Sequence, residues 1–117
     1  MEIKSYNEFQ VMKSHISFSG DIIEIGSGGG WLSQVLTLDA PVKKVVALDN
    51  DAERMARDKP IYSGLINPDM TKLSYMVGDA ECLPKELESD TFDFAILAGS
   101  LHHIAHPVRA LEEAYRI

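Results

Sequence analysis

A glycine-rich segment is the feature of the sequence best suited to bind a ligand. It covers residues 26–30, Gly-Ser-Gly-Gly-Gly, after the apolar run 21–25 and before a second apolar segment that starts at Trp31. Glycine adopts positive φ without strain and leaves no Cβ in the way of a ligand. A helix that follows such a turn offers free N–H groups and the positive end of its dipole to an anion. The pattern therefore predicts a strand, a tight turn and a helix that bind a carboxylate or a phosphate.

The spacing of these glycines argues against a dinucleotide cofactor. A dinucleotide-binding turn reads Gly-x-Gly-x-x-Gly, and counted from Gly26 its last position would be Trp31. The indole would obstruct the close packing of helix on strand that a glycine permits there. The segment instead reads acid-x-Gly-x-Gly-x-Gly, with Glu24 as the acid. An NAD-dependent oxidoreductase is therefore the least favoured function.

A carboxylate at the end of the next apolar run is a second candidate binding group. Asp49 closes the run 44–49, and an acid about 20 residues beyond such a turn can accept hydrogen bonds from ribose hydroxyls. Asp49 could instead cap the following helix, but Asn50 and Asp51 are better placed for that role. We therefore favour the ribose role.

Together these features resemble motif I and the second strand of the class I S-adenosylmethionine-dependent methyltransferases. Residues 77–80, Val-Gly-Asp-Ala, resemble the family's adenine-contacting turn. Residues 92–97 followed by 101–104, Leu-His-His-Ile, resemble its fourth-strand motif. The likeness covers nearly all of residues 21–117 and is greatest to the small-molecule branch, which includes the ubiquinone and menaquinone biosynthesis methyltransferases.

The resemblance implies S-adenosylmethionine as cofactor, S-adenosylhomocysteine as product and methyl transfer to a small-molecule acceptor. It implies that Glu24 orients the turn and reaches the methionine amino group through water, and that Asp79 accepts from the adenine amino group. Asp79 could also be only a loop acid. Ser100 is expected on the acceptor side. The cofactor-binding residues implied are Glu24, Gly26, Ser27, Gly28, Gly30, Asp49, Asn50, Asp79, Ala80 and Ala98.

Three histidines lie close together after the fourth apolar run, at His102, His103 and His106. A metal site is disfavoured because no second cluster supplies further ligands. His102 and His103 are the candidate catalytic residues, since either could act as a general base for a protonated acceptor. The alternative is that the histidines cap and position the loop.

The elements that must position these groups alternate between helix and strand character, which predicts an α/β fold with a doubly wound parallel sheet. Strands are expected at 21–25, 44–49, 73–77 and 92–98. Helices are expected at 6–16, from residue 31, at 51–57 and from Pro107, with Pro60 ending or kinking the third. The last helix is expected to bury Val108, Leu111 and Tyr115.

The resemblance implies a Rossmann-like strand order 3-2-1-4, in one domain of residues 1–117 that lacks the family's later strands. A free edge on the fourth strand and an uncovered helix face would invite a homodimer. A non-catalytic module that binds the cofactor or a partner protein is therefore the second candidate function, after methyl transfer.

Composition limits the class of protein and partner. The chain has 117 residues, and its formal charge of -7 has no basic patch, so nucleic acid is not expected as a partner. No apolar run approaches the ~18 residues of a membrane-spanning helix, so no membrane partner is expected. The start has no signal-peptide pattern and there is one cysteine, which favours a cytoplasmic location.

Overall fold

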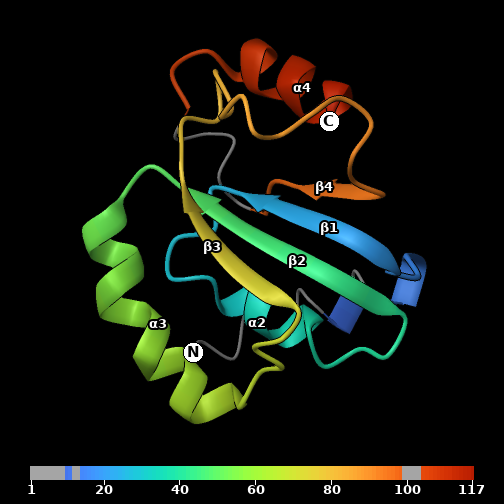
Figure 1. Cartoon of the computed structure of the whole chain (residues 1–117), viewed down its shortest axis with the longest axis vertical. Coiled ribbons are helices and arrows are strands. Elements are labelled where there is room, and N and C mark those ends of the chain that lie inside the picture. The colour runs from blue at the N-terminus through green and yellow to red at the C-terminus, as the bar shows by residue number, and fades with distance from the viewer. Residues whose placement is uncertain (1–9, 12–13, 99–103) are drawn as a thin grey trace.

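The computed structural model describes residues 10–11, 14–98 and 104–117 and contains a parallel four-stranded sheet (Figure 1). The order is β3-β2-β1-β4, and every neighbouring pair is parallel. This confirms the α/β class and the order 3-2-1-4. The first expected helix, 6–16, lies largely outside the described residues. The strands are β1 (Gly20–Ile25), β2 (Val42–Asp49), β3 (Leu73–Val77) and β4 (Phe94–Ile96).

Helices cover both faces of this sheet, as Figure 1 shows. Helices α2 (Trp31–Leu36) and α3 (Ala52–Ile66) lie on one side, and α4 (Pro107–Arg116) lies on the other. Successive residues of β1 alternate between the two cores: Ile22 packs with Leu32 and Leu36, whereas Ile23 packs with Leu83 and Ile117. Both faces of β1 are therefore apolar and buried, as expected of a central parallel strand.

The start of β4 is fixed to the start of β1 by a side chain. The Asp93 Oδ2 accepts a hydrogen bond from the Asp21 N–H at 2.9 Å. This contact lies at the amino ends of the strands, away from the edge where ligands bind in open α/β sheets. Asp93 is therefore a structural acid.

Helix α3 is longer than expected, because Pro60 lies inside it and neither ends nor breaks it. A proline removes one helical hydrogen bond and costs about 3 kcal/mol. Three features offset that cost. Asp51 caps the first turn by accepting from the Arg54 N–H at 2.9 Å, Met55 is buried, and the left-handed Asn67 ends the helix.

The buried face of α4 also differs from the expectation. The predicted stripe faces solvent: Val108 is 65% exposed, Leu111 48% and Tyr115 92%. The helix instead places the small side chains of Ala110 and Ala114 inward, with Ile117 buried at the end of the chain. Ala114 packs against the core that contains Ile23 and Leu83. An exposed apolar stripe is therefore left on α4. In the described part of the chain, β4 pairs only with β1.

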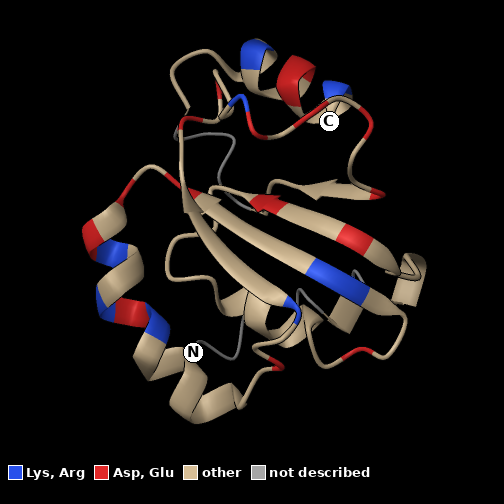
Figure 2. Cartoon of the chain, viewed as in Figure 1, with Lys and Arg blue, Asp and Glu red and all other residues tan. Residues whose placement is uncertain are grey.

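Charges of both signs are interspersed over the described residues (Figure 2). Along α3, basic and acidic positions are mixed and form neighbouring pairs such as Arg57 with Asp58 at 2.9 Å. No helix among the described residues is long and apolar enough to cross a membrane.

Candidate functional site

The glycine turn, residues 26–30, joins β1 to α2 at the carboxyl edge of the sheet. The N–H groups of Gly26 and Ser27 both donate to the Leu48 carbonyl, at 2.8 and 2.9 Å, and so tie the turn to the end of β2. The Gly30 N–H donates back to the Ser27 carbonyl at 2.9 Å. Gly26, Gly28 and Gly30 have φ of 77°, 59° and 83°. This left-handed backbone explains why glycine is needed at alternate positions.

The chain's own side chains fill the space that the missing Cβ atoms leave. A Cβ on Gly28 would lie 2.9 Å from Arg54 Cζ, and one on Gly30 would lie 2.5 Å from Tyr75 Oη. A Cβ on Gly29 would clash with Asp58. The expected reason for these glycines, close approach of a ligand, is therefore incomplete. At these three positions glycine lets the turn pack against α3 and β3.

Asp49 ends β2 with its carboxylate directed at the turn. Its Oδ2 accepts from the Gly28 N–H at 2.8 Å, and its Oδ1 accepts from the Asp51 N–H at 2.8 Å. The side chain is partly buried, whereas the neighbouring Asn50 is exposed. Asp51, and not Asp49, caps α3. The structure thus brings the two predicted binding elements into direct contact.

Glu24 lies beneath the turn and holds the start of α2. It is 4% exposed, and its Oε1 accepts from the Ser33 hydroxyl at 2.7 Å and from the Ser33 N–H at 3.2 Å. Burial raises the pKa of Glu24 to about 7, although the Ser33 hydrogen bonds oppose this shift. One of the N–H groups expected to face a ligand at the helix start is therefore used within the chain.

One polar atom of the turn is buried without a partner. Ser27 Oγ makes no hydrogen bond within the described part of the chain. A buried hydroxyl without a partner is costly, so such an atom indicates a place for a ligand group or a water molecule. This hydroxyl, together with the Asp49 carboxylate, fits the polar groups of a nucleoside.

The loop after β3 brings Asp79 to the same edge of the sheet. The Gly78 N–H donates to the Asp49 carbonyl at 3.0 Å, which fixes the loop to the end of β2. The exposed Asp79 accepts from the Glu81 N–H at 2.9 Å, while Ala80 packs on the core and Ala98 is exposed just beyond β4. The expected contacts with adenine remain predictions, and the Asp79 carboxylate also accepts a hydrogen bond within its own loop.

Of the three clustered histidines, only His106 lies among the described residues. His102, His103 and Ser100 lie outside the described residues, so their expected roles remain predictions. His106 is the exposed residue before α4, and its N–H donates to Glu81 Oε2 at 3.4 Å. Among the described residues, no group of three His, Cys, Asp or Glu side chains could hold a metal ion.

The sequence analysis did not identify three side chains that support the glycine turn. Arg54 and Tyr75 contact the turn itself, and Ser33 contacts Glu24 beneath it. Ser33 follows Glu24 by nine residues on α2, and Tyr75 is the one aromatic residue in the strand segment 73–77. The polar Tyr75 in an otherwise mostly apolar strand was the available signal, because a half-buried hydroxyl needs a partner.

Comparison with known proteins assigns the family. The model of the "Methyltransferase domain" family matches residues 23–117. A 2-methyl-6-phytyl-1,4-hydroquinone methyltransferase of Oryza sativa subsp. japonica is 31% identical over 98 residues, which is 82% of this chain and 25% of the rice protein. The chain thus spans about a quarter of that curated relative.

Solved structures share the fold. The YcgJ protein of Bacillus subtilis superposes with a TM-score of 0.79 and 19% identity, over 95% of this chain and 45% of that one. The arsenic(III) S-adenosylmethionine methyltransferase of Chlamydomonas reinhardtii gives 0.65 and 19%, over 83% of this chain and 34% of that one. With the family match, the glycine turn and the strand order, these findings show that the chain belongs to the methyltransferase-domain family and carries the first part of its Rossmann-like fold.

Proposed function

We propose that the chain binds S-adenosylmethionine at the carboxyl edge of its sheet and forms the cofactor-binding part of a methyltransferase that acts on a small molecule. The observation that carries this proposal is the contact between Asp49 and the turn. Asp49 Oδ2 lies 2.8 Å from the Gly28 nitrogen, so a carboxylate and a glycine turn lie together at the carboxyl edge of the sheet.

The two hydrogen bonds that Asp49 already accepts leave capacity for a ligand. Each carboxylate oxygen has two lone-pair sites, and each oxygen of Asp49 accepts one backbone N–H. Counting the hydrogen bonds among the described residues, one site therefore remains on each oxygen. Two acceptor sites on one carboxylate match the two adjacent hydroxyls of a ribose.

We assign the other proposed contacts with the cofactor from where each residue lies relative to the glycine turn. Ser27 Oγ would meet a polar group of the bound nucleoside, because it is buried and has no partner among the described residues. The adenine would lie toward Asp79 and Ala80, with Asn50 beside it. Glu24 would hold the turn from below through Ser33. Ala98 would border the methionine and acceptor side.

Methyl transfer requires few catalytic groups from the protein, because the cofactor supplies the reactive group. When bound, S-adenosylmethionine supplies a methyl group activated by the sulfonium. This chain's residues would hold the cofactor, orient the acceptor atom toward the methyl group and exclude water. His102 or His103 would accept a proton where the acceptor carries one. The rice relative's name is that of a hydroquinone methyltransferase, which supports a small-molecule acceptor.

Calorimetric titration tests the proposal. Wild-type protein should bind S-adenosylmethionine and S-adenosylhomocysteine but not NAD. Asp49→Ala should weaken binding by about 1.5–3 kcal/mol, because hydrogen bonds to a charged group are lost. Asp51→Asn is the matched control, since asparagine caps a helix as well as aspartate does, and its affinity should equal that of wild type.

Three results would count against the proposal. Tighter binding of NAD would favour the oxidoreductase, and unchanged affinity in Asp49→Ala would remove the ribose assignment. Binding without transfer of a radiolabelled methyl group to any small molecule of a cell extract would favour the non-catalytic module.

A further inference from the structure

We infer that Tyr75 is a positioning residue of the cofactor site, whose hydroxyl fixes the glycine turn from the neighbouring strand β3. This inference rests on the proposed function, because it assigns to Tyr75 a share of the affinity for the nucleoside cofactor. Tyr75 would act through the Gly29 carbonyl, to which its hydroxyl donates, and not by contact with the ligand.

The Tyr75 hydroxyl joins three elements. It donates to the Gly29 carbonyl at 2.8 Å and accepts from Gln34 Nε2 on α2 at 2.9 Å. The same Gln34 nitrogen donates to the Lys59 carbonyl of α3 at 3.2 Å. Gln34 is fully buried. One hydroxyl thus connects the glycine turn to both helices that flank it.

These contacts fix one particular peptide unit of the turn. The peptide between Gly29 and Gly30 is trans, so its carbonyl and its N–H point in opposite directions. The carbonyl accepts from Tyr75, and the N–H donates to the Ser27 carbonyl. The unit cannot rotate without breaking a hydrogen bond on each side. The turn held in this way also contains Gly28, whose N–H donates to Asp49 Oδ2 at 2.8 Å.

The sheet is built so that the Tyr75 ring can reach the turn. Tyr75 pairs in register with Ala47 of β2, and both lie in the same core. The small Ala47 side chain leaves room for the ring to lie across β2 toward the turn that follows β1. Gly30 completes the fit, because any Cβ there would lie 2.5 Å from the Tyr75 oxygen.

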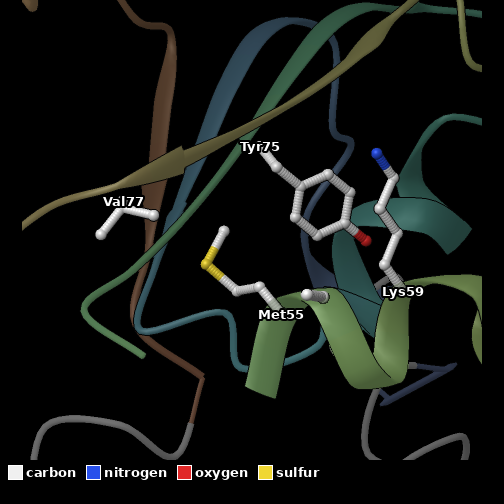
Figure 3. A pocket seen from close by; sticks show the side chains of 5 residues that line it. Met55, Lys59, Tyr75 and Val77 are labelled. Atoms are coloured by element: carbon white, nitrogen blue, oxygen red, sulfur yellow. The ribbon is translucent and has the colours of Figure 1, made fainter. Parts of the chain in front are cut away.

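Lys59 supports the ring from the side of α3. Its Nζ lies 4.7 Å from the centroid of the Tyr75 ring, a cation–π contact. Figure 3 shows both side chains at an open hollow between α3 and β3, which Met55, Ala56 and Val77 also line. Burial raises the pKa of Tyr75 above its usual value, so the hydroxyl stays protonated and able to donate.

The test compares Tyr75→Phe with Tyr62→Phe. Phenylalanine keeps the ring and its contact with Lys59 but removes the hydroxyl that Gly29 and Gln34 share. Tyr62 is a matched control: its ring also lies against Gly29, but its hydroxyl makes no hydrogen bond within the described residues. We expect Tyr75→Phe to weaken binding of S-adenosylhomocysteine about tenfold, and Tyr62→Phe to change it less than twofold.

Two readouts separate positioning from general stability. Trp31 directly follows Gly30 and is the chain's one tryptophan, so its fluorescence reports the turn in the folded protein. Amide hydrogen exchange at Gly30 reports the hydrogen bond to Ser27. In the free protein, Tyr75→Phe should shift the Trp31 emission and speed exchange at Gly30, and Tyr62→Phe should do neither.

Each outcome decides the inference. If wild type binds S-adenosylhomocysteine and Tyr75→Phe binds it equally well when folded, the inference is wrong. If Tyr75→Phe lowers the melting temperature without changing affinity, Tyr75 is merely structural and the inference is again wrong. If wild type itself fails to bind, the proposed function fails. In that case, amide exchange at Gly30 in Tyr75→Phe still tests the role of Tyr75 in the turn. Exchange equal to that of wild type overturns this role, and faster exchange supports it.

Discussion

The region around the glycine turn and the region of β4 and α4 are held in different ways. The first is connected by side chains from several elements: Asp49 binds the Gly28 N–H, Tyr75 binds the Gly29 carbonyl, and Glu24 binds Ser33. The second has a three-residue strand paired on one side and a helix that exposes its larger apolar residues. Within the described residues, the turn region is thus fixed by hydrogen bonds that link several elements, whereas the region of β4 and α4 leaves a strand edge and an apolar helix face uncovered.

The largest expected effect is a substitution that breaks the turn. Gly30→Ala should destabilise the protein by about 2–5 kcal/mol, because alanine at positive φ costs about 1–2 and overpacking against Tyr75 about 1–3. Urea unfolding measures this value. Gly64→Ala is the control: a Cβ there meets nothing within 4 Å, and alanine inside helix α3 should stabilise by about 0.5–1 kcal/mol. Equal effects of the two changes would contradict the packing described for Gly30.

The next effect concerns the buried acid beneath the turn. The folded-state pKa of Glu24 is raised from 4.5 to about 7, so the folded protein binds more protons than the unfolded chain between these pH values. The contribution of Glu24 to stability is therefore fully present below pH 4.5 and is lost as the pH rises to 7, a change of about 3 kcal/mol.

Glu24→Gln should abolish this contribution. Glutamine keeps an oxygen that accepts from Ser33 but carries no charge. The difference in unfolding free energy between Glu24→Gln and wild type should move in favour of the variant as the pH rises from 4.5 to 7. A difference that is independent of pH over this interval would show that Glu24 is not buried as described.

The smallest effect on stability is expected at α4. We propose that the chain associates with itself through the exposed stripe of Val108, Leu111 and Tyr115 and the free edge of β4, because apolar patches of this kind favour association. Sedimentation velocity should show dimers that Leu111→Lys disrupts. The free energy of unfolding of that variant should stay within about 0.5 kcal/mol of the monomeric wild type, since Leu111 is exposed. A wild-type chain that stays monomeric at high concentration would refute the proposal.

The parts of the fold that the sequence predicted correctly depend on local patterns. The segments 21–25, 44–49 and 73–77 each correspond to an observed strand, since an uninterrupted apolar run bounded by glycine or polar residues suits a buried parallel strand. The expected segment 92–98 was too long, because β4 covers only Phe94–Ile96. The glycine turn and Asp49 followed from motif spacing and from the rule that ligands bind at the carboxyl ends of parallel strands.

Local patterns were insufficient where a neighbour decides the outcome. Pro60 is a helix breaker in isolation, but an aspartate cap, the burial of Met55 and a left-handed end at Asn67 keep α3 intact. The stripe of Val108, Leu111 and Tyr115 has helical spacing, yet α4 places Ala110 and Ala114 inward instead. Helical spacing alone does not specify which face of a helix packs against the rest of the chain.

By itself, the sequence determined the alternation of strand and helix, the positive-φ turn and the acid at the end of β2, since each depends on residues that are neighbours along the chain. Only the tertiary structure decided that Tyr75 reaches Gly29 across β2, that Arg54 lies against Gly28, and that α4 presents its alanines to the sheet. These contacts join residues far apart in the chain. They depend on the register of the strands and on the available volume, which no local periodicity specifies.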